Sequence, residues 1–99
     1  MILVVTAEAE ADLESIGDHI AQRNPGRAVS FIRELRDVCG SILAAPNGYP
    51  LVRKYEGSGI RRRPHGNYLI FYRATDAAVE IIAILHGARD YEPLLFPEA

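Results

Sequence analysis

Three strand-like segments follow one another in the second half of the chain, and they constrain the fold more than any other feature. They are Ile60–Arg63, residues 67–73 and residues 79–86. Within residues 67–73 the side chains alternate, so that Tyr68 and Tyr72 share one face of the strand. Residues 79–86 are mostly apolar at both alternating sets of positions, which is typical of a central strand covered on both faces. The order of these segments predicts a mostly antiparallel sheet.

Further segments extend this prediction in both directions along the chain. Leu51–Tyr55 has the composition of a short strand, and Gly57-Ser58-Gly59 is predicted to be the turn that follows it. Pro64-His65-Gly66 is predicted to turn the chain before residues 67–73. Met1–Val5 is almost entirely apolar, and we expect it to form a strand beside residues 79–86.

Two amphipathic helices are predicted between the N-terminal strand and the sheet. Thr6 is a good N-cap for the first helix, and Asn24-Pro25 ends this helix and begins the next. Ala45–Gly48 ends the second helix. So short a connection predicts an antiparallel helical hairpin, whose apolar stripes only the sheet can cover. The stripes are Ala9, Leu13, Ile16 and Ile20 in the first helix and Ala28, Phe31, Leu35, Val38 and Ile42 in the second.

The predicted fold is therefore α+β, with one domain over residues 1–99. It comprises an N-terminal strand, an antiparallel two-helix hairpin, a three- to four-stranded antiparallel sheet and a short C-terminal tail. No apolar run approaches the ~20 residues of a membrane span, and Met1–Thr6 lacks the basic start of a signal peptide. We expect a cytoplasmic protein without membrane contact. The single cysteine, Cys39, lies on the apolar side of the second helix and excludes an internal disulfide.

The charge of the chain is unevenly distributed. The formal net charge is −2, yet residues 1–50 carry four arginines and seven acids, which gives −3. Residues 53–73 carry six basic side chains and only one acid, Glu56, which gives +5. A local positive surface of this size attracts anionic partners. The alternative is a solvated sheet edge, because arginine also protects edge strands from aggregation.

No arrangement of residues in the sequence predicts a metal, a cofactor or a nucleophile. His65 and His86 both precede a glycine at a predicted strand end, and two histidines can act as general acid and base. No spacing enforces that geometry, and a capping or packing role is the alternative. His19 is expected to be solvated. The chain has no His-x-x-x-His spacing and no cysteine pair, and Gly57-Ser58-Gly59 lacks the lysine and the helix of a phosphate-binding loop.

Three runs of residues carry a family resemblance. They are Arg61 to Arg73 (Arg-x-x-x-His-Gly-x-Tyr-x-Ile-Phe-Tyr-Arg), Ile84 to Asp90 (Ile-Leu-His-Gly-Ala-Arg-Asp) and Ala9 to Ile16 (Ala-x-x-Asp-Leu-x-x-Ile). With the order of elements, they resemble the RelE/ParE superfamily of toxins from type II toxin–antitoxin systems. The resemblance covers essentially the whole chain and is closer to the ParE branch, of the plasmid stabilisation type, than to the RelE branch.

The resemblance implies a toxin without catalytic residues that inhibits DNA gyrase. It also implies a ParD-like antitoxin as partner, in a hetero-oligomer such as a heterotetramer, with operator DNA bound only through the antitoxin. An antitoxin segment that folds on binding would lie in the groove between the helical hairpin and the sheet or along a sheet edge.

Two alternatives remain open. One is a ribosome-dependent mRNA endonuclease of RelE type, for which the matching residues are Arg53, Lys54, Arg61, Arg73 and Tyr91. Such an enzyme needs several cations near the scissile phosphate and an acid or base. The other is a toxin-fold protein that binds its partner but has lost activity. The overall acidity and the His-Gly-Ala-Arg-Asp run favour the gyrase inhibitor.

The candidate target-binding residues are the basic segment and the C-terminal tail. Replacing Arg61 and Arg63 by alanine is expected to leave the fold intact and to weaken toxicity. In the tail, the apolar residues either pack back onto the sheet or contact the target or the antitoxin. The full set of candidates is Arg61, Arg62, Arg63, Arg73, Arg89, Tyr91, Leu94, Leu95 and Phe96.

Overall fold

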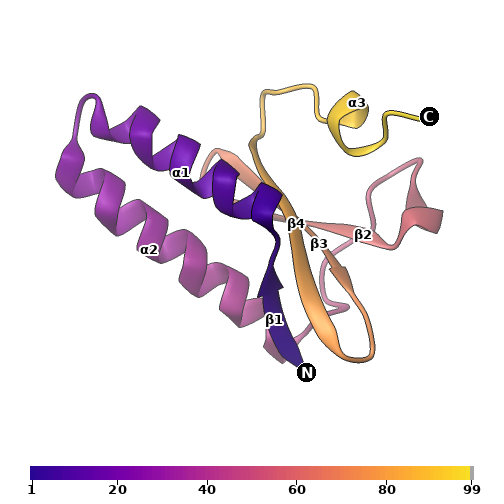
Figure 1. Ribbon diagram of the computed structural model, residues 1–99. Coiled ribbons are helices and arrows are strands. Elements are labelled where there is room, and N and C mark those ends of the chain that lie inside the picture. Colours follow the sequence, from indigo (N-terminus) through magenta and orange to yellow (C-terminus); the bar gives the residue numbers. More distant parts are fainter. Residues whose placement is uncertain (99) are drawn as a thin grey trace.

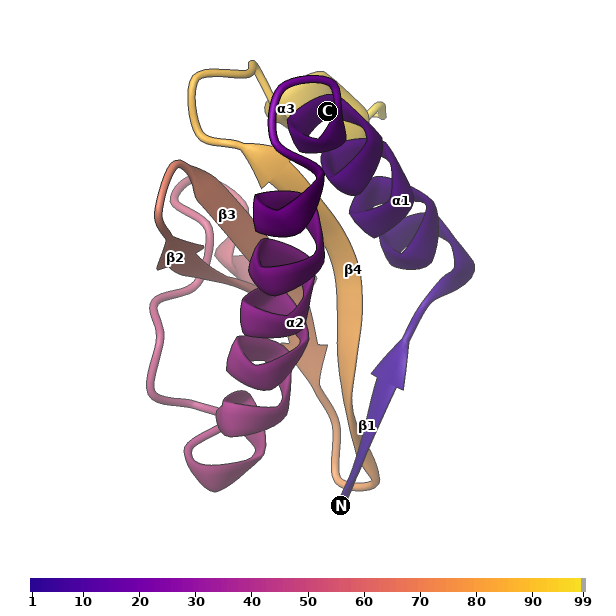
Figure 2. The ribbon, with the colours of Figure 1, turned by 90° about the vertical axis from the view of Figure 1, so that its left-hand side faces the viewer.

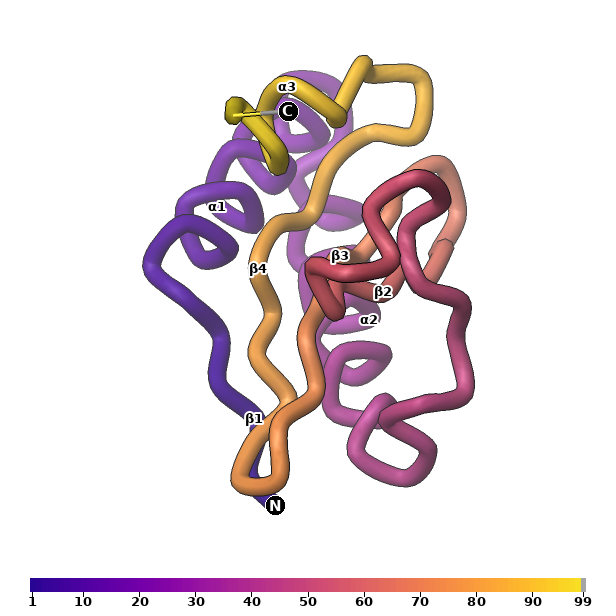
Figure 3. The backbone as a smooth tube through the Cα atoms, turned by 90° about the vertical axis from the view of Figure 1, so that its right-hand side faces the viewer, coloured from indigo at the N-terminus to yellow at the C-terminus, as the bar shows by residue number. Residues whose placement is uncertain are grey.

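Within residues 1–98, which this computed structural model describes, a helical hairpin covers one face of a four-stranded sheet (Figures 1 and 2). The opposite face, called the open face below, carries the loop that precedes β2 and the short C-terminal segment (Figure 3). The elements in chain order are β1 (Ile2–Val5), α1 (Ala7–Ala21), α2 (Pro25–Ser41), η1 (Ile42–Ala44), η2 (Glu56–Ser58), β2 (Ile60–His65), β3 (Tyr68–Ala74), β4 (Ala78–His86) and α3 (Glu92–Leu95).

The strands lie in the order β1-β4-β3-β2, with β4 and β3 at the centre. β2 pairs antiparallel with β3, and β3 pairs antiparallel with β4. β1 pairs with β4 in parallel, because the hairpin and the meander carry the chain back before β4 begins. The α+β class and the position of the N-terminal strand beside residues 79–86 are confirmed, while the sheet is antiparallel only in its last three strands.

Both helices begin as the sequence predicts. The Thr6 hydroxyl accepts a hydrogen bond from the Ala9 N–H at 3.2 Å, and the Asn24 carbonyl Oδ1 accepts one from the Arg27 N–H at 3.0 Å. The Thr6 hydroxyl also donates to the carbonyl of Ile81 in β4 at 2.7 Å. The same side chain therefore ends β1, starts α1 and holds this junction against the central strand.

The main core lies between the hairpin and the sheet. Leu13 of α1 and Leu35 of α2 meet Ile70, Tyr72 and Ile84 of the sheet, all of them buried. The sequence predicted both leucines on the packing stripes, and this is confirmed. Cys39 is part of the same core, and its burial raises the pKa of the thiol to about 11.

Two predicted details of the region before β3 are wrong. Leu51–Tyr55 is not a strand, since only Leu51 forms a bridge to Arg61 and the chain then turns, with the Tyr55 N–H donating to the Val52 carbonyl. Pro64-His65-Gly66 is not the turn either, because β2 continues through His65 and the chain turns at Gly66 and Asn67. Proline is tolerated here since β2 is an edge strand.

The core assignment can be measured by truncating one leucine. Replacing Leu35, which is fully buried, by alanine is expected to lower the free energy of unfolding by about 2–5 kcal/mol, because the lost contacts leave a cavity. Urea unfolding followed by circular dichroism measures this. Val29→Ala on the exposed side of the same helix is the control, with an expected loss below about 0.5 kcal/mol. Equal losses in the two variants would contradict the assignment.

Candidate functional site

A basic groove lies on the open face at the β2 end of the sheet. It is formed by the loop that precedes β2, by the middle of β2 and by the start of the C-terminal segment. Arg62 donates to the Tyr91 hydroxyl at 3.5 Å across this groove, which joins the strand to the C-terminal segment. We call it the basic groove; its lining residues are Pro50, Leu51, Val52, Arg53, Lys54, Arg62, Tyr91 and Glu92.

Strand alternation separates the arginines that are adjacent in sequence. Arg62 lies opposite Phe71 and belongs to the open face. Arg61 and Arg63 point to the hairpin side, where Arg61 donates to the Tyr49 carbonyl at 2.7 Å. The guanidinium of Arg63 lies 5.3 Å from the centre of the Tyr49 ring. These two arginines hold the loop that follows α2. Replacing them by alanine is therefore expected to lower the stability of the fold, which differs from the expectation based on the sequence.

Arg73 also has a structural contact. It lies opposite Ile60 on the open face, and its Nε donates to the Ser58 carbonyl at 3.1 Å. This bond holds the short turn η2 against the sheet. Of the five residues considered for an endonuclease, three meet in the basic groove, namely Arg53, Lys54 and Tyr91. The structure does not bring Arg61 or Arg73 to that groove.

The backbone of Lys54 is in the left-handed region, with φ 74°, and Lys54 is the only non-glycine residue of the described chain with a positive φ. Conformations of this kind are unfavourable for side chains with a Cβ atom, and they concentrate at functional sites. The strained turn directs an exposed lysine to the rim of the basic groove.

The C-terminal segment packs back onto the open face for most of its length. The ring of Phe96 stacks on Tyr55, with 3.8 Å between ring centres, and Tyr91 lies 4.8 Å from Phe71. Leu95 joins the same apolar cluster. Leu94 differs, since 49% of its surface is exposed. The expectation that the tail packs on the sheet is therefore met by Leu95 and Phe96, while Leu94 remains available to a partner.

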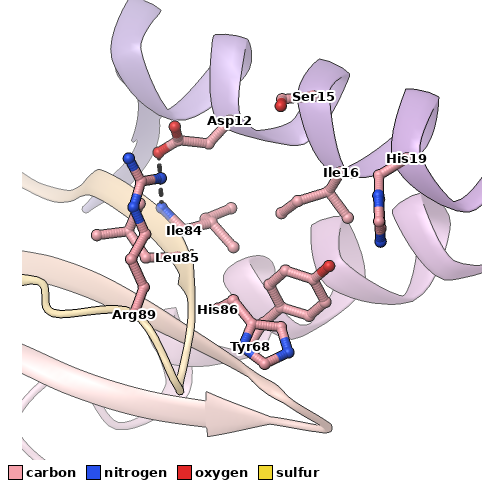
Figure 4. A pocket seen from close by; sticks show the side chains of 9 residues that line it. All are labelled: Asp12, Ser15, Ile16, His19, Tyr68, Ile84, Leu85, His86 and Arg89. Carbon is pink, nitrogen blue, oxygen red and sulfur yellow. Dashed lines mark hydrogen bonds between the residues drawn. The ribbon is translucent and has the colours of Figure 1, made fainter.

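A second groove lies between α1 and the end of β4 (Figure 4). Its central residue, Asp12, belongs to the motif from Ala9 to Ile16, but the sequence analysis gave it no role of its own. The Ile84 N–H donates to the Asp12 carboxylate at 2.9 Å. β1 ends before this point, so the carboxylate takes the place of a strand neighbour. Burial raises the pKa of Asp12, against the lowering effects of the Ile84 bond and of Arg89. The sequence did contain one signal for this role, because Asp12 is a carboxylate that borders the apolar stripe of the first helix.

His65 and His86 lie on either side of Tyr68 in the sheet, and each makes structural contacts. The Nδ1 atom of His86 accepts the Ala88 N–H at 3.1 Å, and the His86 ring packs edge-on against Tyr68. His65 lies 3.5 Å from the Glu34 carboxylate and beside Phe31. His19 is exposed and lines the second groove (Figure 4). Within residues 1–98 no three potential metal ligands come together.

Comparison with known proteins agrees with this fold and with the sequence motifs. The profile of the family described as "ParE toxin of type II toxin-antitoxin system, parDE" matches residues 3–91. The chain belongs to the ParE toxin family. A solved chain described as "Chromosomal ParDE TA system from P. aeruginosa" is similar in fold to this ParE toxin, with a TM-score of 0.73 and 22% sequence identity. The match covers 87% of the present chain and 95% of the solved one. No curated protein matches in sequence.

None of the helices in residues 1–98 of this ParE toxin has the length and apolar character needed to cross a membrane.

The role of Asp12 can be tested by two substitutions. Asp12→Leu is expected to lower the free energy of unfolding by about 1–3 kcal/mol, because the Ile84 N–H loses its acceptor. Asp12→Asn keeps an acceptor oxygen and is expected to stay within about 1 kcal/mol of the wild type. Equal losses in both variants, measured by urea unfolding at pH 7, would show that the hydrogen bond does not matter.

The same residue gives a pH dependence with a defined sign. A raised pKa in the folded state means that folding favours the protonated carboxyl group, so the Asp12 contribution to stability is greatest below the unfolded pKa, about 3.9. It falls as the pH rises from there through the folded pKa. Subtracting the stability of Asp12→Asn from that of the wild type between pH 3 and 6 should show this decline. A difference that grows with pH would contradict it.

The strain at Lys54 gives a third test. Lys54→Gly is expected to raise the free energy of unfolding by up to about 1 kcal/mol, because glycine adopts a positive φ without the steric cost. Gly59 also has a positive φ, 75°, and Gly59→Ala is the matched opposite change, with a loss of about 1 kcal/mol expected. Thermal unfolding of both variants measures these shifts.

Proposed function

We propose that this protein inhibits DNA gyrase without acting as an enzyme and is neutralised by a ParD-like antitoxin in a hetero-oligomer. Membership in the ParE toxin family supports the toxin role. The motifs from Arg61 to Arg73 and from Ile84 to Asp90 resemble the ParE branch, whose toxins poison gyrase. A similar solved chain comes from a ParDE system, which supports a partner of the ParD type.

The observation that carries the non-enzymatic part of the proposal is the separation of the basic side chains. An RNA-cleaving site needs its cations and its acid or base aimed at one phosphodiester. Here Arg61 donates a hydrogen bond to the Tyr49 carbonyl on the hairpin side, and Arg73 donates one to the Ser58 carbonyl. Two of the five residues considered for an endonuclease therefore hold neighbouring loops. This arrangement supports an inhibitor that acts by surface contact.

The basic groove is the proposed contact surface for the target. Arg53 and Lys54 are exposed at its rim, and Arg62 and Tyr91 supply a further cation and an aromatic ring. Such a surface favours a partner that bears phosphates or carboxylates. The exposed Leu94 lies on the neighbouring C-terminal segment and adds an apolar contact.

A ribosome-dependent endonuclease is the second candidate. It is favoured by one observation, that Arg53, Lys54 and Tyr91 line the same groove. For a cationic site in this groove, Arg62 would have to play the role that the sequence analysis gave to Arg61.

A gyrase assay separates the two candidates. Antitoxin-free protein is mixed with gyrase, ATP and supercoiled plasmid, and linear DNA covalently held by gyrase is measured. The proposal predicts trapped cleavage complexes that decrease on addition of the antitoxin. Intact plasmid, obtained with a preparation that still arrests growth, would contradict the proposal and direct attention to messenger RNA cleavage on the ribosome.

The contact surface has its own prediction. Arg53→Gln combined with Lys54→Gln is expected to reduce trapped cleavage complexes at least tenfold without lowering the melting temperature, because both side chains are exposed. Arg23→Gln combined with Arg33→Gln removes the same charge from exposed positions of the hairpin and serves as the control. Equal activity of the two double variants would exclude the basic groove as the contact surface.

A further inference from the structure

Three cationic side chains line the basic groove without forming an ion pair. They are Arg53 and Lys54 of the loop that precedes β2 and Arg62 of β2 itself. None of the ion pairs within residues 1–98 involves any of the three. The one acid in the lining is Glu92, whose carboxylate accepts a hydrogen bond from the Tyr55 hydroxyl at 3.2 Å. Three cations and one carboxylate give the lining a net charge of +2.

Both walls of the groove are held in place by the protein itself. The Arg62 N–H donates to the Pro50 carbonyl at 3.1 Å, which binds the loop to β2. On the other side, the ring of Tyr91 lies 4.8 Å from that of Phe71 and fixes the start of the C-terminal segment on the sheet. A ligand therefore meets a groove that is already formed, and binding loses little conformational entropy of the backbone.

The Tyr91 hydroxyl adds a neutral donor to the three cations. It accepts the hydrogen bond from Arg62, so its own hydrogen is available for an acceptor in the groove. Arginine, lysine and tyrosine side chains are among the groups that contact phosphate oxygens in protein–DNA complexes. The lining contains neither Asn nor Gln, the side chains that pair with adenine. These groups suit a phosphodiester backbone that is contacted largely without regard to base sequence.

We propose that the basic groove binds the phosphodiester backbone of duplex DNA, so that the toxin contacts the DNA of the gyrase complex as well as the enzyme. This inference rests on the proposed function, since it names the part of the target that the groove contacts. The three cations neutralise phosphates and release their counterions, while Tyr91 donates to a phosphate oxygen.

The alternative occupant is an acidic protein surface, and the arrangement of the cations favours DNA. Carboxylates on protein surfaces are separate charges, and an exposed ion pair with one of them contributes little. Duplex DNA carries one charge per about 1.7 Å of its axis, and each neutralised phosphate releases counterions. Three cations in an open groove can bind such an array without matching the position of any single charge. The net charge of −2 keeps the affinity for free DNA low.

DNA binding by the toxin alone tests this inference. The probe is a fluorescein-labelled duplex of about 30 base pairs, followed by fluorescence anisotropy between about 20 and 100 mM salt. Three neutralised phosphates give a slope of about −2.7 for log K against log salt, so the affinity is expected to fall about 80-fold over this range. Absence of binding at the lowest salt concentration, or a slope near zero, would overturn the inference.

Two double variants locate the contact. Arg53→Gln combined with Lys54→Gln removes two of the three cations, and the slope is expected to fall to about −0.9, which is about a fourfold loss over the same range of salt. Arg23→Gln combined with Arg33→Gln removes the same charge from exposed positions outside the groove, and its slope is expected to equal that of the wild type. Equal slopes of the two double variants would overturn the inference.

Competition identifies the kind of polyanion. Unlabelled duplex DNA and polyglutamate are added at equal concentrations of negative charge, and the DNA is expected to displace the probe at least tenfold more effectively. Equal displacement would point to an acidic protein surface and overturn the inference. Tighter binding of single-stranded RNA than of duplex DNA would also overturn it, in favour of the endonuclease.

The gyrase assay separates this inference from the proposed function. A toxin that traps cleavage complexes but does not bind DNA by itself at low salt would leave the proposed function intact and overturn the inference alone. A toxin that binds DNA with the expected slope but does not trap gyrase would contradict the proposed function and support the phosphate contact.

Discussion

The burial of β4 on both faces is the constraint on which the rest of the structure depends. The hairpin covers Ile81 and Ile84 on one face, while Ala83 and Leu85 belong to the cluster under the C-terminal segment on the other. A strand covered in this way must be central, so β1 and β3 lie on its two sides. The hairpin is tied to it by Thr6 and Asp12, whose hydrogen bonds reach the β4 backbone where β1 ends.

The elements that depend on local pattern could be predicted from the sequence. The caps at Thr6 and Asn24 and the stripes through Leu13 and Leu35 fixed the hairpin, because short-range hydrogen bonds and periodic burial act within each helix. Leu51–Tyr55 was misassigned for the opposite reason. Its composition suits a strand, but the backbone turns at Lys54 and only Leu51 reaches β2.

The candidate site was less predictable, because it depends on which side of a strand each residue faces. Three consecutive arginines look like one basic patch in the sequence, yet Arg62 faces the basic groove and its two neighbours hold Tyr49. Strand alternation would have separated them, but the contacts with Tyr49 are tertiary. The role of Asp12 was also missed, since the need for an acceptor at Ile84 arises only where β1 leaves the sheet.

The hydrogen bond between Asp12 and Ile84 has a geometric consequence for any chain that joins the sheet. Beyond Thr6 the outward N–H of β4 is already occupied by the side chain from α1, and the helix itself leaves the plane of the sheet at that point. An added strand cannot pair with β4 at Ile84, because the Asp12 carboxylate already occupies the hydrogen-bonding position that β1 leaves vacant. The exposed edge of the central strand therefore ends where the first helix begins.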